Sequence, residues 1–142
     1  MNSNQSEIQS AVGCDVSKDT VTLFDSNIGK TSTVENTAAA LKAALKPYAG
    51  CVDMLAVCEA TGGYEDTLLC VLERLAIPAH RADAARVKAF IRSCGTWAKT
   101  DPIDARHLAE SGLSHGRSLP RWQAPAPDYA RMKLPVMRRA DL

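Results

Sequence analysis

Short apolar runs separated by turn-forming residues mark the strands of this chain. They are rich in β-branched and aliphatic residues, and they predict five strands, over residues 11–16, 20–25, 30–34, 51–59 and 77–82. Residues 17–19 and 26–29 are turn sequences, so the first three strands are expected to form an antiparallel meander. The fourth run is the most apolar, and it ends at Glu59 just before the Gly62-Gly63 break.

Apolar residues with helical spacing fill the segments between and after these strands. The pattern predicts helices over residues 38–46, 64–75, 84–92 and 102–113. We expect N-caps at Asn36, Asp83 and Asp101, with Pro102 at the favoured first helical position. The order of elements predicts an α/β fold with a mixed sheet and helices on both faces.

Composition narrows the class of protein. The 142 residues suffice for one domain, and 46% hydrophobic residues can bury a core. No apolar run approaches the roughly 20 residues that span a bilayer, and the polar N-terminus does not resemble a signal peptide. The five cysteines are odd in number and lack C-x-x-C spacing, which favours a reducing compartment. The sequence therefore predicts a cytoplasmic protein with no membrane partner.

The pattern also predicts domain boundaries. We interpret residues 1–9 as a disordered N-terminus, 10–113 as the folded domain, and 114–142 as a Pro- and Arg-rich linker followed by the start of a truncated helical segment. Residues 114–142 hold six Lys or Arg against two Asp. This basic tail is either a phosphate-binding segment or a solvated tail, and charge alone does not decide between them.

Four acidic residues stand where elements begin or end: Asp15, Glu59, Asp101 and Asp104. Carboxylates repel one another, so a fold that gathers several of them usually does so around a divalent cation. Taken singly, each has an ordinary structural explanation. Asp15 can cap a turn, Glu59 can be a surface residue, and Asp101 with Asp104 can form a helix cap and its capping box on one helix face.

Three sequence strings contain these acids, and together they resemble a known family. VGCDVSKDT, CEATGGYE and GTWAKTDPIDARHLAE are similar, in order and spacing, to the N-terminal domain of the DEDD transposases of the insertion-sequence 110 family, which includes pilin-gene-inverting recombinases. The resemblance runs from about Val12 to Leu113 and implies the RuvC branch of the ribonuclease-H-like fold. It implies that the four acids are a catalytic tetrad that coordinates Mg²⁺, or alternatively Mn²⁺.

The resemblance also implies partners and a missing part. Family members act on DNA, are guided by a structured RNA, form homo-oligomers at full length, and carry a nucleophilic serine in a C-terminal domain. No segment of this sequence resembles that serine domain, so we expect a truncated transposase that is not active on its own. By their position beside the acids, Lys99, Arg106 and Trp97 are candidate nucleic-acid contacts, although each can equally serve charge balance or packing.

Two other functions remain as alternatives. The chain can be a non-catalytic nucleic-acid-binding or dimerisation remnant of a transposase. An actin-like nucleotide-binding protein also opens with a hairpin that carries an aspartate, but it needs a second glycine-rich phosphate loop, and the sequence shows none. The two glycines after Glu59 either let backbone approach a phosphate or permit a sharp strand-to-helix turn. Tyr64, which follows them, can contact DNA or pack into the core, and we expect it to pack into the core.

Overall fold

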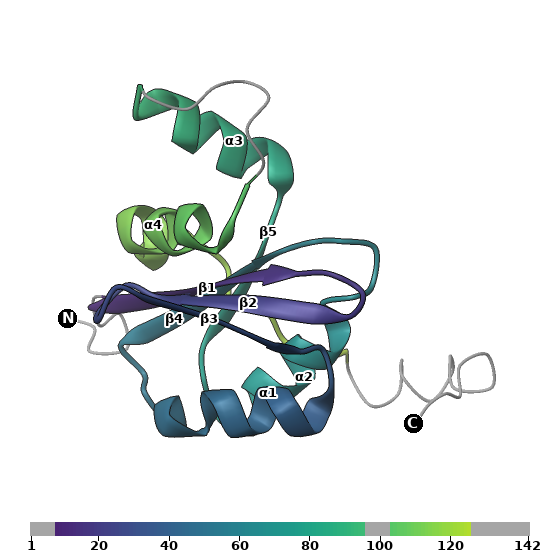
Figure 1. The fold of residues 1–142 in the computed structure, drawn as a ribbon. Helices are drawn as coiled ribbons and strands as arrows, with labels where there is room; N and C mark the ends of the chain where they lie inside the picture. The colour runs from purple at the N-terminus through teal and green to yellow at the C-terminus, as the bar shows by residue number, and fades with distance from the viewer. Residues whose placement is uncertain (1–7, 96–102, 126–142) are drawn as a thin grey trace.

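A single mixed sheet organises the molecule. The computed structural model describes residues 8–95 and 103–125, and its strands lie in the order β3-β2-β1-β4-β5 (Figure 1). Their bounds are Ser10–Val16 for β1, Thr20–Asp25 for β2, Lys30–Glu35 for β3, Met54–Glu59 for β4 and Ala79–Ala82 for β5. The first three strands pair antiparallel, whereas β4 and β5 extend the sheet parallel to β1. The predicted meander and the ribonuclease-H-like class of fold are confirmed.

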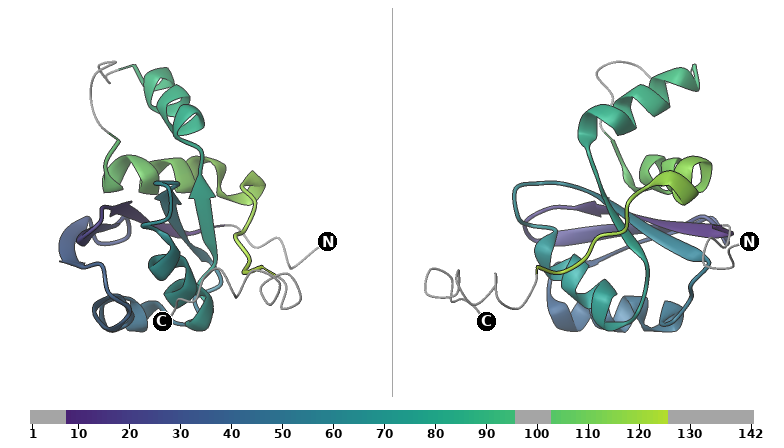
Figure 2. Two further views of the ribbon diagram at one scale, coloured as in Figure 1. Left: turned by 90° about the vertical axis from the view of Figure 1, so that its right-hand side faces the viewer. Right: turned by 180° about the vertical axis from the view of Figure 1, so that it is seen from behind.

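Helices cover both faces of this sheet, as predicted. They are α1 (Ala38–Leu45), α2 (Asp66–Arg74), α3 (Ala84–Ser93) and α4 (Ala105–His115), with 3-10 turns η2 (Lys46–Tyr48) and η3 (Gly116–Ser118). Figures 1 and 2 show α1 and α2 on one face and α4 on the other, with α3 packed on α4 and projecting from the body. No helix in the two described ranges is long and apolar enough to cross a membrane.

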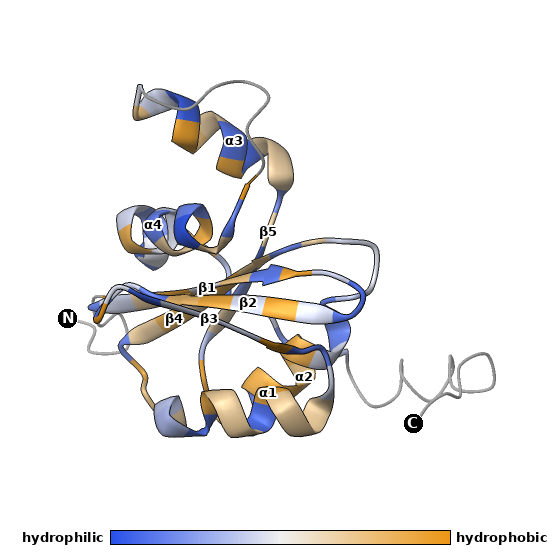
Figure 3. Ribbon diagram, in the orientation of Figure 1, coloured by the Kyte–Doolittle hydropathy of each residue, from blue (hydrophilic) through white to orange (hydrophobic). Residues whose placement is uncertain are grey.

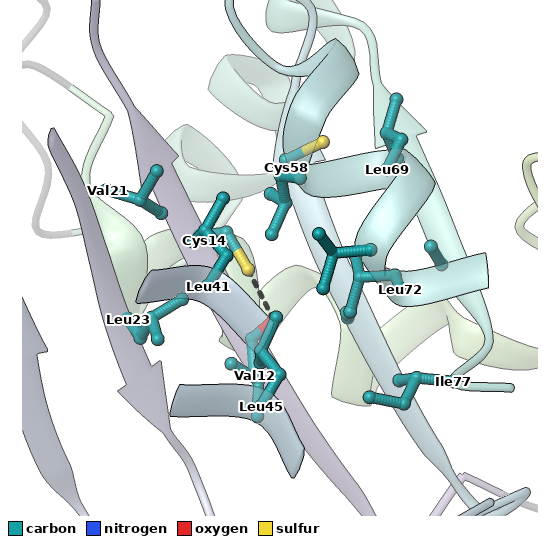
Figure 4. Close-up of a cluster of buried hydrophobic side chains, with 14 of the residues drawn as sticks. Val12, Cys14, Val21, Leu23, Leu41, Leu45, Cys58, Leu69, Leu72 and Ile77 are labelled. Atoms are coloured by element: carbon teal, nitrogen blue, oxygen red, sulfur yellow. Dashed lines mark hydrogen bonds between the residues drawn. The ribbon is translucent and has the colours of Figure 1, made fainter. Parts of the chain in front are cut away.

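The face under α1 and α2 carries the larger core. Alternation along β1 turns Val12, Cys14 and Val16 towards these helices, and all three are buried. Leucines of α1 and α2 fill the space above them, among them Leu41, Leu45, Leu69 and Leu72 (Figure 4). Figure 3 shows the corresponding hydrophobic bands on the two helices. Each such leucine contributes about 1.5–3 kcal/mol by leaving water.

The opposite face is built differently, because α4 lies almost directly on β1. A Cβ added at Gly13 would stand 1.7 Å from the backbone oxygen of Ala105, and one added at Gly112 would stand 2.8 Å from Cγ2 of Val57. Only glycine leaves room for this approach of helix to strand. The core on this side is smaller and includes Leu55, Val57, Val87, Ile91 and Leu108.

Several predicted boundaries and caps are wrong. Thr37, rather than Asn36, caps α1, because its hydroxyl oxygen accepts from the Ala40 N–H at 3.2 Å. The last helix begins at Ala105, so Asp104 is its N-cap and not a residue of its first turn. The fourth strand begins at Met54 instead of residue 51, after a turn. Caps are hard to choose in sequences where two or more capping residues stand close together.

The segment after α4 packs on the domain up to Trp122. Its Trp122 N–H donates to the Ala79 carbonyl at 2.7 Å, and His80 Nδ1 bonds the Pro120 carbonyl at 2.7 Å. The indole of Trp122 packs against the larger core. This segment therefore lies along the outer edge of β5, where it satisfies backbone groups that would otherwise be open (Figure 2). Residues 114–125, which the sequence places in a linker, are thus in part attached to the sheet.

Candidate metal-binding carboxylate site

Two of the predicted acids lie side by side on the α4 face of the sheet. Strands β1 and β4 are parallel neighbours, and Cys14 pairs with Cys58. Both cysteines point into the larger core, so the next residue on each strand, Asp15 and Glu59, points to the opposite face. Asp15 is exposed and Glu59 is half-buried. The two carboxylates therefore share one face at the carboxyl ends of adjacent parallel strands, which is where ligands gather in open α/β sheets.

A third acid reaches the same place from α4. Asp104 caps this helix, and its Oδ1 accepts from the His107 N–H at 3.0 Å while His107 Nδ1 accepts from the Asp104 N–H at 3.3 Å. The close contact of Ala105 with Gly13 sets this helix start beside Asp15, two residues further along β1. The packing of α4 thus determines where Asp104 lies.

Electrostatics show that these acids interact. Partial burial of its carboxyl group raises the pKa of Asp15, and the neighbouring charge of Asp104 raises it further. Burial also raises the pKa of Glu59, with the charge of Asp15 adding to the effect and that of Lys88 opposing it. Asp15 consequently interacts with both other carboxylates, and it stands between them in the charge network.

The fourth acid of the predicted set, Asp101, lies outside the described residues. Asp104 precedes its helix as the N-cap, and the prediction that it shares a helix face with Asp101 falls outside the described residues. Within residues 8–95 and 103–125, no three His, Cys, Asp or Glu side chains stand close enough to hold a metal ion. The donor chemistry, oxygen only, suits a hard divalent cation, whereas the described carboxylates alone do not complete its ligand set.

Comparison with known proteins decides the family. Residues 12–142 match the family model of the DEDD transposases of the insertion-sequence 110 type, which is described as a transposase. The chain belongs to this transposase family. A search of curated proteins gives no match. Transposases act on DNA, and the DEDD type depends in general on divalent metal ions.

The loop after Glu59 contains two glycines, for which the sequence allows either a phosphate-binding loop or a sharp strand-to-helix turn. Glu65 is buried, with 2% of its surface exposed, and its Oε1 accepts from Thr61 N–H at 3.0 Å, Thr61 Oγ1 at 2.6 Å and Gly63 N–H at 3.2 Å. These amides are the groups that a phosphate-binding loop would offer to its ligand. The protein's own carboxylate occupies them, so Gly62 and Gly63 serve a sharp strand-to-helix turn.

The charge of Glu65 is well stabilised. Burial acts to raise its pKa, but hydrogen bonds from the Thr61 side chain and from the backbone of Glu65, Thr61 and Gly63 outweigh it and lower the pKa. Arg81 adds an ion pair at 3.5 Å from its own, more exposed position on β5. The loop that follows Glu59 is therefore held by an internal anion.

The remaining predicted contacts have mixed outcomes. Lys99 and Trp97 lie outside the described residues, and Arg106 is exposed and pairs with Glu110 at 3.2 Å. Tyr64 does not pack into the core as predicted, because half of its surface is exposed. Sequence reasoning missed Lys88 of α3, which acts electrostatically on Glu59. The signal for Lys88 was its place on the helix after β5, since β5 pairs with β4 at Glu59.

Proposed function

We propose that this chain is the metal-dependent DNA-processing part of a transposase, with Asp15, Glu59, Asp101 and Asp104 as ligands of Mg²⁺ or Mn²⁺. The observation that supports this most is the position of Asp15, which interacts with Glu59 and Asp104 on one face of the sheet. A bound ion would polarise a phosphodiester group and stabilise the charge that develops during its cleavage.

The side chains of this chain prepare such a site. Burial disfavours the ionised forms of Asp15 and Glu59, the charges of Asp104 and Asp15 respectively add to this effect, and a cation would offset those charges. Lys88 partly offsets the charge of Glu59 and is available to contact a phosphate oxygen nearby. Arg106 follows Asp104 on α4, so we assign it, together with Lys99 and Trp97, to nucleic-acid binding.

Further partners belong to the same proposal. A structured guide RNA, assembly with further copies, and a nucleophilic serine supplied by a separate domain are each inferred from the family alone. Strand transfer through a covalent intermediate would require that serine together with the carboxylate site, and we expect the residues of this chain to bind metal and DNA.

Metal-dependent DNA binding tests the proposal. A labelled 30-base-pair duplex is titrated with the chain in Mg²⁺, in Ca²⁺ and in EDTA, and binding is followed by fluorescence anisotropy. We expect both ions to tighten binding relative to EDTA, because a bound cation offsets the repulsion between the carboxylates and phosphate, and Asp15→Asn to remove that gain. Binding that is equal in EDTA, and equal in Asp15→Asn, would identify a non-catalytic nucleic-acid-binding protein instead.

A further inference from the structure

Asn36 directly follows β3 in the chain, and it does not cap the helix that comes after it. Its neighbour Thr37 caps α1 instead. The Asn36 backbone N–H donates to the Asp19 carbonyl at 2.9 Å, in the turn between β1 and β2. The residue is thereby anchored at the end of the sheet where Asp15 and Glu59 lie.

The side chain of Asn36 joins two loops. Its Nδ2 donates to the Ser17 carbonyl at 2.9 Å and to the Tyr64 carbonyl at 3.1 Å. Ser17 lies two residues after Asp15, and Tyr64 lies in the loop that begins after Glu59. One amide group thus connects the turn that follows the first acid to the loop that follows the second.

The orientation of this amide follows from its surroundings. Both neighbours are carbonyl oxygens, which only accept, so the NH₂ group must face them. Asn36 Oδ1 is then left buried, with no hydrogen-bond partner among the described residues. A buried acceptor without a partner costs free energy. The two bonds from Nδ2 fix the side chain in spite of that cost.

Hydrogen bonds also hold the two connected segments in place between the bridge and the acids Asp15 and Glu59. On the β4 side, Ala60 N–H bonds the Ala82 carbonyl at 3.1 Å, and Glu65 holds Thr61 and Gly63. On the β1 side, Ser17 N–H bonds the Thr20 carbonyl at 2.8 Å. A bridge between these segments therefore acts on the acids through short, hydrogen-bonded stretches of chain and not through mobile loops.

We propose that Asn36 is a positioning residue for the carboxylate site, which holds the chain after Asp15 and the chain after Glu59 at a fixed separation. The inference rests on the proposed metal site, since it states how that site is kept in order. Asn36 acts in this proposal through the two carbonyl groups that its Nδ2 bonds and not through direct contact with the metal.

The test compares Asn36→Ala with Thr37→Ala in the full chain. Thr37→Ala removes the cap of α1 at the adjacent residue and leaves the bridge intact, so it controls for loss of stability. Both variants should lower Tm by a few degrees, about 2–4 °C. Mn²⁺ affinity, measured by electron paramagnetic resonance of the free ion, should fall about tenfold in Asn36→Ala alone. Asn36→Leu, which keeps the side-chain volume without the donors, should behave as Asn36→Ala does.

Amide hydrogen exchange without metal provides a second measurement. In Asn36→Ala the Ser17 and Thr61 amides should both lose protection, whereas Thr37→Ala should affect amides of α1 only. Mn²⁺ affinity and exchange in Asn36→Ala that match those of Thr37→Ala would overturn the inference while wild-type binding upholds the metal site. Failure of the wild-type chain to bind Mn²⁺ would overturn the metal site and the positioning role with it.

Discussion

The two faces of the sheet are stabilised in different ways. Under α1 and α2, large aliphatic side chains fill the space between helix and strand, and the sheet contributes Val12, Cys14 and Val16. Under α4 the contact is made by Gly13 and Ala105, and backbone lies on backbone. On the first face, large side chains keep the helices at a distance from the sheet. On the second face, the helix backbone approaches the strand as closely as sterics allow.

Because of this difference, one face of the sheet mainly stabilises the fold, whereas the other also positions the carboxylates. Successive residues of β1 point to opposite faces, so Cys14 belongs to the larger core while Gly13 and Asp15 belong to the α4 face. The missing side chain at Gly13 admits α4, and α4 then sets Asp104 beside Asp15. Mutations on the first face should therefore change the free energy of unfolding, whereas mutations at the α4 contact should also change the site.

The largest effect on stability is expected on the α1 and α2 face. Leu69 is fully buried in the larger core. Leu69→Ala should lower the free energy of unfolding by about 3–4 kcal/mol through lost burial and a residual cavity. Urea denaturation measures this loss. The folded fraction should bind Mn²⁺ as the wild type does, and a parallel loss of affinity would show that the two faces are not separable.

On the other face of the sheet, Gly13→Ala should change both the stability and the geometry of the carboxylate site. Its new Cβ would meet the Ala105 carbonyl oxygen, so α4 must move away from β1, at about 2–3 kcal/mol. Because Asp104 moves with α4, we expect Mn²⁺ affinity to fall about tenfold as well. Urea denaturation and Mn²⁺ titration measure the two effects.

Gly29→Ala is the matched control for that substitution. Gly29 has a φ of +67°, open space around it, and a place in the turn between β2 and β3. Alanine there should cost about 1 kcal/mol of backbone strain without altering metal affinity. Gly13→Ala that keeps wild-type Mn²⁺ affinity would show that the close helix contact does not position Asp104.

Glu65 yields a prediction that depends on pH. Its pKa lies below the ordinary 4.5, so its charge stabilises the fold above pH 4.5, and this stabilisation is lost as pH falls through the lowered pKa. Glu65→Gln should be about 1–2 kcal/mol less stable than the wild type at pH 7. Urea denaturation at a series of pH values should show the difference shrinking in acid. A difference that is constant with pH would mean that hydrogen bonding, not charge, is what Glu65 contributes.

The smallest effect is expected at Asp15, where a substitution should stabilise the metal-free protein. Its pKa is raised above 3.8, so the ionised form that prevails at pH 7 is disfavoured in the folded state. Asp15→Asn should raise Tm at pH 7 by about 2 °C. The gain in Tm should vanish below about pH 3.8, where Asp15 is protonated and uncharged in both the folded and the unfolded protein. Scanning calorimetry in EDTA measures it, and a Tm that falls at pH 7 would contradict the assigned repulsion.

The sequence predicts the architecture well because burial patterns repeat over whole elements. The meander follows from apolar runs separated by turn sequences, the fourth strand follows from a continuous apolar run, and the structure confirms both. The helix over residues 84–92 is likewise confirmed with Asp83 as its cap. Each of these predictions averages over several residues, so a single atypical side chain does not change it.

Predictions that depend on one side chain were less successful. Asn36 and Thr37 can both cap a helix, and Asp101 and Asp104 compete in the same way. Which residue caps depends on tertiary hydrogen bonds, such as those of Asn36 to Ser17 and Tyr64, that no local pattern encodes. The role of Glu65 likewise depends on a folded loop, and Lys88 lies near Glu59 only through the pairing of β4 with β5.

Calorimetric titration of Mn²⁺ into the metal-free chain tests the central claim most directly. We expect saturable binding by the wild type, binding weakened at least about tenfold in Asp15→Asn, and wild-type binding in Asp53→Asn. Asp53 is an exposed aspartate that precedes β4 at the other end of the sheet, so it controls for a general loss of negative charge. Absence of binding by the folded wild type, or equal binding by Asp15→Asn, would contradict a metal site at these carboxylates.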